Sequence, residues 1–272
     1  MDHFNCSSID RFGHIKIKIM FTKKKFLIYG LGKSGISTYN FLKKKNEVYL
    51  YDDNRTVLSN KKFKKFSIQS RDISKKNFDY IVLSPGIDLN KCRLKIFLKN
   101  NLKKIITDLD IFYKNYYKNK NITITGTNGK STTAKILFNL LKSTKKDVRL
   151  TGNIGNPILS EKKINSKTIF VIEASSYQID YSKFFKANYA LILNISPDHL
   201  ERHKTFENYV KIKFKLFKNQ GQNDYSFFDF NNEHLKKQVK KNKLNSKLYN
   251  LNIKLLKKYF KKINMSPFRT SK

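Results

Sequence analysis

The stretch that decides the fold is NITITGTNGKSTT, which runs from Asn121 to Thr133. Its β-branched first half predicts a strand, its glycines a turn, and the residues from Lys130 onward a helix that continues through Leu140. This layout is typical of a phosphate-binding loop, where backbone N–H groups and a helix N-terminus surround an anion, a lysine reaches the outer phosphates and a hydroxyl binds Mg²⁺. We therefore predict a nucleoside triphosphate site at Gly126, Thr127, Asn128, Gly129, Lys130, Ser131 and Thr132.

The loop departs from the strict G-x-x-x-x-G-K-[ST] pattern, because Ile124 stands where the first glycine would be. A structural alternative is a helix that happens to begin after a glycine turn and to carry a lysine. The order of strand, glycines, lysine and hydroxyl favours the phosphate-binding interpretation.

Length and composition set the broad class. A chain of 272 residues is long enough for two domains. It contains no run of the ~18 apolar residues that a membrane-spanning helix needs, and its N-terminus lacks the order of a signal peptide. Cys6 and Cys92 form no metal-binding or disulfide pattern, which suits a reducing cytosol, so we expect a cytoplasmic protein without a membrane partner.

The formal net charge of +37 suggests a nucleic-acid partner, but its distribution does not. Seven of the 57 basic residues are Arg, which leaves 50 Lys spread along the chain among many Ile, Asn, Phe and Tyr. Nucleic-acid interfaces are usually richer in clustered Arg. Codon bias toward A and T explains this composition more simply, so we expect no specific nucleic-acid partner.

The N-terminal region predicts a small α/β domain. Residues 1–20 show no periodicity and are expected to be a disordered extension, with Met20 as an alternative start. A buried strand, FLIYG, then leads into GLGKSG, which has G-x-G-x-x-G spacing. The next strand, EVYLYDD, ends at Asp52 and Asp53, where a Rossmann fold places its ribose-binding acid. Alone, this pattern is also compatible with a dinucleotide-dependent dehydrogenase.

Two shorter strands, at Tyr80–Ser84 and Lys104–Thr107, complete this layer, which predicts a Rossmann-like domain over 21–115. The second domain, 116–272, repeats the pattern: Thr168–Glu173 and Tyr189–Ile195 are apolar strands, the first ending at Glu173 and the second followed by His199. Ligands bind beyond the carboxyl ends of parallel strands, so we expect the phosphate loop, Glu173 and His199 to converge. The structural alternative for Glu173 is a capping or solvated carboxylate, and for His199 it is a hydrogen-bonded loop histidine.

Lys213 is the most informative single residue. On a helix through TFENYVKIKFKLFKN it shares an apolar stripe with Tyr209 and Val210, whereas Lys211 and Lys215 face the other way. A buried charged lysine without a partner is costly and tends toward the neutral amine. Its side chain either extends to solvent along the stripe or is used chemically.

Together these segments resemble the Mur ligase family from about Phe26 to Phe230. The resemblance rests on an ordered set of motifs: GLGKSG, SPGI (Ser84 to Ile87), DLDIF (Asp108 to Phe112), TGTNGKSTT, TGNIG (Thr151 to Gly155), EASSYQ (Glu173 to Gln178), SPDHLERH (Ser196 to His203) and the helix of Lys213. It implies an α/β protein in which a small Rossmann-like N-terminal domain is followed by an incomplete P-loop-type parallel-sheet central ATPase domain.

The implied activity is an ATP-dependent amide ligation in peptidoglycan precursor synthesis. The substrates implied are UDP-N-acetylmuramoyl-L-alanine and D-glutamate, joined through an acyl phosphate with release of ADP. The physical logic fits, because a carboxylate acylates poorly until phosphorylation installs a leaving group, and cations must offset the charge on the transferred phosphoryl group.

The resemblance also implies site residues. Lys130, Glu173, His199 and Lys213 would be catalytic; Ser131 and Glu173 would hold a first Mg²⁺, and His199 with a carbamate on Lys213 a second. Asn153, Ser175 and Gln178 lie where the family contacts the muramoyl group. The UDP end would bind the first domain, which displaces the dehydrogenase interpretation, at Lys33, Ser34, Asp53, Asn54, Arg55 and Gly86.

The family pattern continues with an H-N-x-x-N segment that meets adenine and a C-terminal domain that binds D-glutamate, and neither is found in these 272 residues. We therefore expect an incomplete ligase that does not complete ligation by itself. Two alternatives remain: a non-catalytic fragment that only binds nucleotide or UDP-sugar, and folylpolyglutamate synthase, which the GLGKSG domain disfavours.

Overall fold

The computed structural model describes residues 21–251, and the expected extension over 1–20 lies outside them. The chain divides into two compact units. Within the described residues, the first comprises 21–119 together with 157–168 and 181–185, and the second comprises 120–156, 169–180 and 186–251. The observed division along the chain falls between Asn119 and Lys120, whereas the sequence predicted one between 115 and 116. In addition, the two short later segments 157–168 and 181–185 belong to the first unit.

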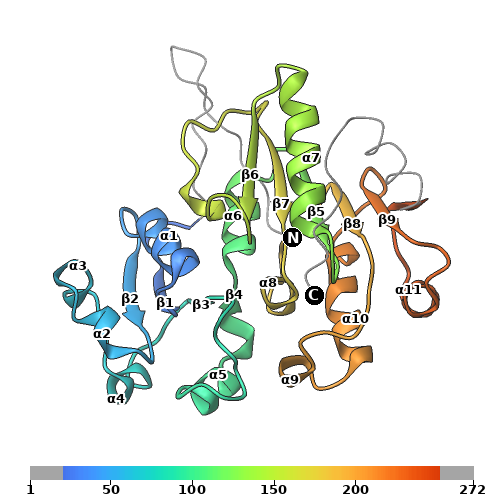
Figure 1. Cartoon of the computed structure of the whole chain (residues 1–272). Coiled ribbons are helices and arrows are strands. Elements are labelled where there is room, and N and C mark those ends of the chain that lie inside the picture. Colours follow the sequence, from blue (N-terminus) through green and yellow to red (C-terminus); the bar gives the residue numbers. More distant parts are fainter. Residues whose placement is uncertain (1–20, 252–272) are drawn as a thin grey trace. The chain divides into compact units, whose positions relative to one another are not determined.

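The first unit is a four-stranded parallel sheet in the order β2-β1-β3-β4 (Figure 1). Its strands are β1 (Lys25–Tyr29), β2 (Glu47–Tyr51), β3 (Tyr80–Leu83) and β4 (Ile105–Ile106). Its helices are α1 (Lys33–Leu42), α2 (Arg55–Leu58), α3 (Lys61–Lys64), α4 (Ser70–Ile73), α5 (Lys95–Asn100) and α6 (Asp108–Tyr116), with 3₁₀ turns at Leu102–Lys104 and Ile158–Ser160.

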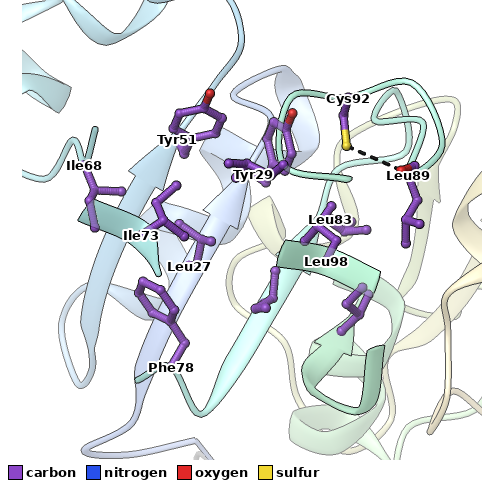
Figure 2. Close-up of a cluster of buried hydrophobic side chains, with 13 residues drawn as sticks. Leu27, Tyr29, Tyr51, Ile68, Ile73, Phe78, Leu83, Leu89, Cys92 and Leu98 are labelled. Atoms are coloured by element: carbon purple, nitrogen blue, oxygen red, sulfur yellow. Dashed lines mark hydrogen bonds between the residues drawn. The ribbon is translucent and has the colours of Figure 1, made fainter. Parts of the chain in front are cut away.

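One face of this sheet forms an aromatic and aliphatic core. Figure 2 shows Leu27 and Tyr29 of β1 packed with Tyr51, Phe78 and Leu98. Alternate residues of a strand point to one face, so the near-continuous apolar run of β1 supplies both faces of the sheet, as expected of a parallel strand. The Cys92 thiol donates to the carbonyl oxygen of Leu89 inside this core (Figure 2).

Asp110 of α6 connects the later segment 181–185 to the first unit. Its carboxylate is fully buried, and its Oδ1 accepts hydrogen bonds from the Ser182 hydroxyl at 2.8 Å and from the N–H groups of Lys183, Phe184 and Phe185 at 2.7–2.9 Å. Its Oδ2 caps α6 by accepting from the Thr107 N–H. A buried carboxylate is tolerated when donors surround it in this way.

The second unit is a six-stranded sheet in the order β10-β9-β8-β5-β7-β6, parallel throughout (Figure 1). Its strands are β5 (Asn121–Thr125), β6 (Val148–Gly152), β7 (Ile169–Glu173), β8 (Tyr189–Ile192), β9 (Tyr225–Phe228) and β10 (Lys247–Asn250). Its helices are α7 (Lys130–Ser143), α8 (Ser176–Asp180), α9 (Leu200–His203), α10 (Phe206–Phe214) and α11 (Glu233–Lys241), with a 3₁₀ turn at Lys215–Phe217. The fold class predicted from the sequence, α/β with parallel sheets, is confirmed.

The single long helix expected around Lys213 is shorter than the pattern indicated, because α10 ends at Phe214 and the chain tightens into the 3₁₀ turn. Within 21–251, no helix has the length and apolarity required to cross a membrane.

Candidate active site

The phosphate loop, Glu173 and the segment that leads to His199 follow three neighbouring strands. β5 pairs with β7 on one side and with β8 on the other, and all three run parallel. Ile124 lies opposite Glu173 in this register. The three segments therefore leave the same edge of the sheet, as the sequence predicts.

The glycines of the phosphate loop adopt backbone conformations that other residues rarely adopt. Gly126 has φ = 151° and Gly129 has φ = 80°, and Gly129 immediately precedes α7 without a side-chain cap. The first N–H groups of α7 therefore have no capping side chain, which is the arrangement that favours an anion. The Lys130 ammonium folds back and donates to the Thr127 carbonyl at 2.7 Å, and burial lowers the pKa of Lys130.

Asn194, which follows β8, holds the loop. Its carbonyl accepts from the Thr127 N–H at 3.1 Å, its Oδ1 accepts from the Asn128 N–H at 2.8 Å, and its Nδ2 donates to the Asn128 carbonyl at 2.9 Å. Sequence reasoning missed this residue. The available signal was a polar side chain near the carboxyl end of the apolar run Tyr189–Ile195, whose strand neighbours the loop strand.

Glu173 lies at the centre of the site and is 1% exposed. Its Oε2 accepts from the Ser131 hydroxyl at 2.7 Å, and its Oε1 accepts from Asn153 Nδ2 at 2.8 Å. Gly152 makes this possible, because its φ is 105° and a Cβ there would lie 2.3 Å from the Glu173 carbonyl oxygen. Three predicted residues from three segments therefore form one hydrogen-bonded cluster.

The Ser131 hydroxyl and the Glu173 carboxylate suit Mg²⁺, which prefers hard oxygen ligands and usually binds one or two protein groups together with phosphate oxygens and water. Within 21–251 no group of three or more His, Cys, Asp or Glu side chains is arranged to hold a metal by itself. The donor set thus fits an ion shared with a nucleotide and does not form an all-protein cage.

Lys213 is buried on α10, with 2% of its surface exposed. Its Nζ donates to the Gly126 carbonyl at 3.0 Å and to the Thr125 hydroxyl at 3.3 Å, and it lies 4.6 Å from the Tyr209 ring centre. Burial, with a smaller contribution from the positive charge of Lys130, lowers the pKa of Lys213 to about 7. An amine with this pKa is partly neutral, and therefore nucleophilic, near pH 7.

His199 precedes α9 in the left-handed conformation, with φ = 52° and a side chain that is 43% exposed. Its ring lies 4.9 Å from that of Tyr177, and its Nε2 is 3.4 Å from Asp198 Oδ2. Tyr209 connects it to Lys213, since the Tyr209 ring is 6.5 Å from the His199 ring and forms the cation–π contact with Lys213.

The three residues predicted to contact the muramoyl group take different positions in this unit. Asn153 binds Glu173 through its side chain. Ser175 and Gln178 bind each other at the start of α8, where the buried Gln178 Oε1 accepts from the Ser175 N–H at 3.1 Å.

The candidate residues of the first unit follow β1, β2 and β3, which are adjacent. Ser34 donates to Asp108 at 2.5 Å, Asp53 accepts from the Tyr29 hydroxyl at 2.7 Å, and Asn54 caps α2 by accepting from the Thr56 N–H. The remaining three are exposed: Lys33, Arg55 and Gly86. Gly35 allows α1 to approach β1 closely, because a Cβ there would lie 1.8 Å from the Gly30 carbonyl oxygen.

A parallel sheet that carries a glycine-rich loop between a central strand and a helix, with a buried carboxylate on the next strand, defines an α/β protein with a P-loop ATPase-type domain. Residues 124–272 match the family described as the Mur ligase middle domain. The chain therefore belongs to the Mur ligase family.

Curated relatives carry the name UDP-N-acetylmuramoylalanine–D-glutamate ligase. One from Rickettsia bellii is 38% identical over 78% of this chain, and one from Caldicellulosiruptor saccharolyticus is 37% identical over 77%. The chain spans about half the length of these relatives, 47% and 48%. The fold resembles that of UDP-N-acetylmuramate:L-alanyl-gamma-D-glutamyl-meso-diaminopimelate ligase from Neisseria meningitides, with a TM-score of 0.53 and 14% identity over 84% of this chain and 78% of that one.

Proposed function

We propose that this chain supplies the nucleotide-binding and UDP-sugar-binding parts of a ligase that adds D-glutamate to UDP-N-acetylmuramoyl-L-alanine. The observation that carries the proposal is the cluster of Ser131, Glu173 and Asn153 beside a phosphate loop, in a chain whose relatives bear that enzyme's name. A reducing cytoplasm is the compartment that suits the free thiol of Cys92 and this substrate.

The proposed reaction has two steps. A substrate carboxylate oxygen attacks the γ-phosphorus of ATP, the bond to the β-phosphate oxygen breaks, and ADP leaves. The amine of D-glutamate then attacks the acyl carbon, inorganic phosphate leaves, and an amide forms. Lys130 and the N–H groups of residues 126–131 offset the charge on the transferred phosphoryl group, which is the main contribution a protein makes to such a transfer.

Two Mg²⁺ ions are part of the proposal and would supply further positive charge at the phosphates. Ser131 and Glu173 would hold the first, and His199 with a carbamate on Lys213 the second. A partly neutral Lys213 amine fits this role, because its lone pair adds to the carbon of CO₂ with loss of a proton. The one hydrogen left on the carbamate nitrogen would be available to the Gly126 carbonyl, which accepts from the Lys213 amine at 3.0 Å.

The substrate contacts are proposed on both units separately. On the second unit, Asn153, Ser175 and Gln178 would contact the muramoyl group. On the first unit, the ends of β1, β2 and β3 would bind the uridine diphosphate end through the six residues described above. Exposed Lys33 and Arg55 are the cations available there for a diphosphate.

A second candidate function is nucleotide and UDP-sugar binding without ligation by the 272 residues alone. It is favoured by the chain's match to 47% of the Rickettsia bellii relative. One experiment separates the candidates: the purified chain is titrated with ATP and Mg²⁺ and then assayed with both substrates for amide product. Product formation supports ligation, binding without product supports the second candidate, and absence of nucleotide binding rejects both.

A further inference from the structure

Asn194 connects the end of β8 to the phosphate loop through its side-chain amide. It is half-buried and lies just beyond β8, which ends at Ile192. Both polar groups of the amide bind the backbone of one residue, because Oδ1 accepts from the Asn128 N–H at 2.8 Å and Nδ2 donates to the Asn128 carbonyl at 2.9 Å. The opposite amide orientation would place donor against donor and acceptor against acceptor. The pairing therefore fixes the two peptide groups that flank Asn128.

The backbone of the loop also continues the pairing of β5 with β8. The Leu193 N–H donates to the Thr125 carbonyl at 3.0 Å, and beyond the strands the Thr127 N–H donates to the Asn194 carbonyl at 3.1 Å. Gly126 allows this approach, because a Cβ there would lie 3.2 Å from Leu193 Cβ and 3.3 Å from the Asn194 carbonyl oxygen. Backbone and side chain thus attach the loop to the same short segment.

The Thr127 hydroxyl extends this attachment toward His199. It accepts from the Ser196 N–H at 3.1 Å and lies 3.1 Å from the Ser196 carbonyl oxygen and 3.3 Å from the Tyr209 hydroxyl. Ser196 precedes His199 by three residues, and the Tyr209 ring is 6.5 Å from the His199 ring. One hydroxyl of the loop therefore contacts both the chain that leads to His199 and the ring beside it.

We propose that Asn194 is a positioning residue that holds the phosphate loop in its anion-binding conformation before a nucleotide arrives, and that Thr127 joins this loop to the segment of His199. The proposal rests on the proposed nucleotide site and assigns a role to a side chain outside it. Fixing a loop costs conformational entropy, and glycines such as Gly126 and Gly129 lose the most. A ligand that meets a loop already fixed by the protein does not bear this cost.

Calorimetric titration with ADP and Mg²⁺ provides the first test. Asn194→Ala removes two hydrogen bonds to the loop and should lower the affinity for ADP at least about fivefold. Asn194→Leu, which keeps a branched side chain of similar shape without its polar groups, should lose as much. Wild-type affinity in either variant, with folding verified by circular dichroism, would overturn the proposal.

Asn232→Ala is the matched control. Asn232 caps α11, between β9 and β10, by accepting from the Leu235 N–H at 3.0 Å, so this variant also loses a bond from an Asn side chain to the backbone. It should unfold at a lower temperature than wild type and bind ADP as wild type does. A loss of affinity equal to that of Asn194→Ala would show that general destabilisation explains both, and would overturn the role of Asn194.

Hydrogen exchange without nucleotide provides the second test. In the wild-type chain the Asn128 amide should exchange at least about tenfold more slowly than in an unfolded chain, and Asn194→Ala should remove most of this protection. Exchange at the unfolded rate in the wild type, or equal protection in the variant, would overturn the proposal. A wild-type chain that binds no ADP would reject the proposed nucleotide site, and the exchange rates would still decide whether Asn194 holds the loop.

Two substitutions of Thr127 test the connection to the segment of His199. Thr127→Val keeps the shape of the side chain and loses the hydroxyl, whereas Thr127→Ser keeps the hydroxyl that binds Ser196. Saturating ADP should slow exchange of the Ser196 amide in the wild type and in Thr127→Ser, and should have little effect in Thr127→Val. An equal effect of ADP in both variants would overturn the connection.

Discussion

The Nζ of Lys213 lies 3.0 Å from the carbonyl oxygen of Gly126, so an amine from α10 donates a hydrogen bond to the backbone of the phosphate loop. The contact turns a buried cation toward the negative end of a peptide group, which partly compensates its lost hydration. It also connects the ionisation of Lys213 to the stability of the loop.

The free energy of unfolding should depend on pH in a way that reflects the burial of Lys213. The unfolded chain keeps the Lys213 proton up to about pH 10.5, whereas the folded chain releases it near pH 7. The unfolded state therefore binds more protons between these values, and this group's contribution makes the folded state more stable as pH rises through that window. In CO₂-free buffer, Lys213→Met should be more stable than wild type below pH 7, and this advantage should shrink as pH rises toward 10.

Urea unfolding at several pH values measures that difference, and the neighbouring exposed Lys211→Met serves as control. A difference between Lys213→Met and wild type that stays constant with pH would contradict the assignment.

Lys130→Met should weaken nucleotide binding. The substitution keeps the length of the side chain but removes the charge that reaches over the loop. Hydrogen bonds to charged groups contribute roughly 1.5–3 kcal/mol, which corresponds to a loss of about 10- to 150-fold in affinity for ADP or ATP. Isothermal titration calorimetry measures the change, and Lys135→Met, on the exposed side of α7, should bind as wild type does.

Gly152→Ala should destabilise the second unit by roughly 2–3 kcal/mol, because the residue has positive φ and its new Cβ would meet the Glu173 carbonyl. Thermal unfolding tests the loss. Gly221→Ala is the matched control, since its nearest neighbour would be 3.8 Å away. An equal effect of both substitutions would show that the close approach at Glu173 is unimportant.

Asp110→Asn should weaken the attachment of 181–185. An amide nitrogen in place of one carboxylate oxygen opposes a donor with a donor, and an unsatisfied buried group costs roughly 1–3 kcal/mol. Hydrogen exchange should speed up at Lys183, Phe184 and Phe185, whose N–H groups bind this carboxylate. Asp88→Asn, at a partly exposed turn, should leave those amides unchanged.

The sequence predicted the elements with strong local signals. The strands β1, β2, β3, β5, β7 and β8 are apolar runs bounded by glycine or polar residues, and each lies within two or three residues of its expected end. Helical periodicity placed Lys213 on the apolar stripe but left open an extension to solvent, and the structure shows it buried. Short, polar elements gave no such signal: β10 is KLYN with every residue exposed, and β6 is VRLTG, so both depend on neighbouring strands for their conformation.

In the candidate site, too, some features follow from the sequence pattern and others do not. Convergence of the phosphate loop with Glu173 follows from the topology of a parallel sheet. The hydrogen bonds of Asn194 to the phosphate loop and of Asn153 to Glu173 do not follow from that topology. They depend on the positions of side chains that are at least 20 residues apart in the sequence. Local sequence patterns do not predict such pairs. They also do not predict that the amides of 183–185 bind Asp110.

Strand β5 shares both of its edges, one with β7 and one with β8. A slip of one position in the pairing with β7 would turn Glu173 away from the loop, since alternate residues face opposite sides. A sheet in which β5 and β7 are out of register therefore lacks the candidate site altogether. As denaturant is added, affinity for nucleotide should vanish in one sharp transition that coincides with loss of the β-sheet signal, and gradual weakening beforehand should be absent.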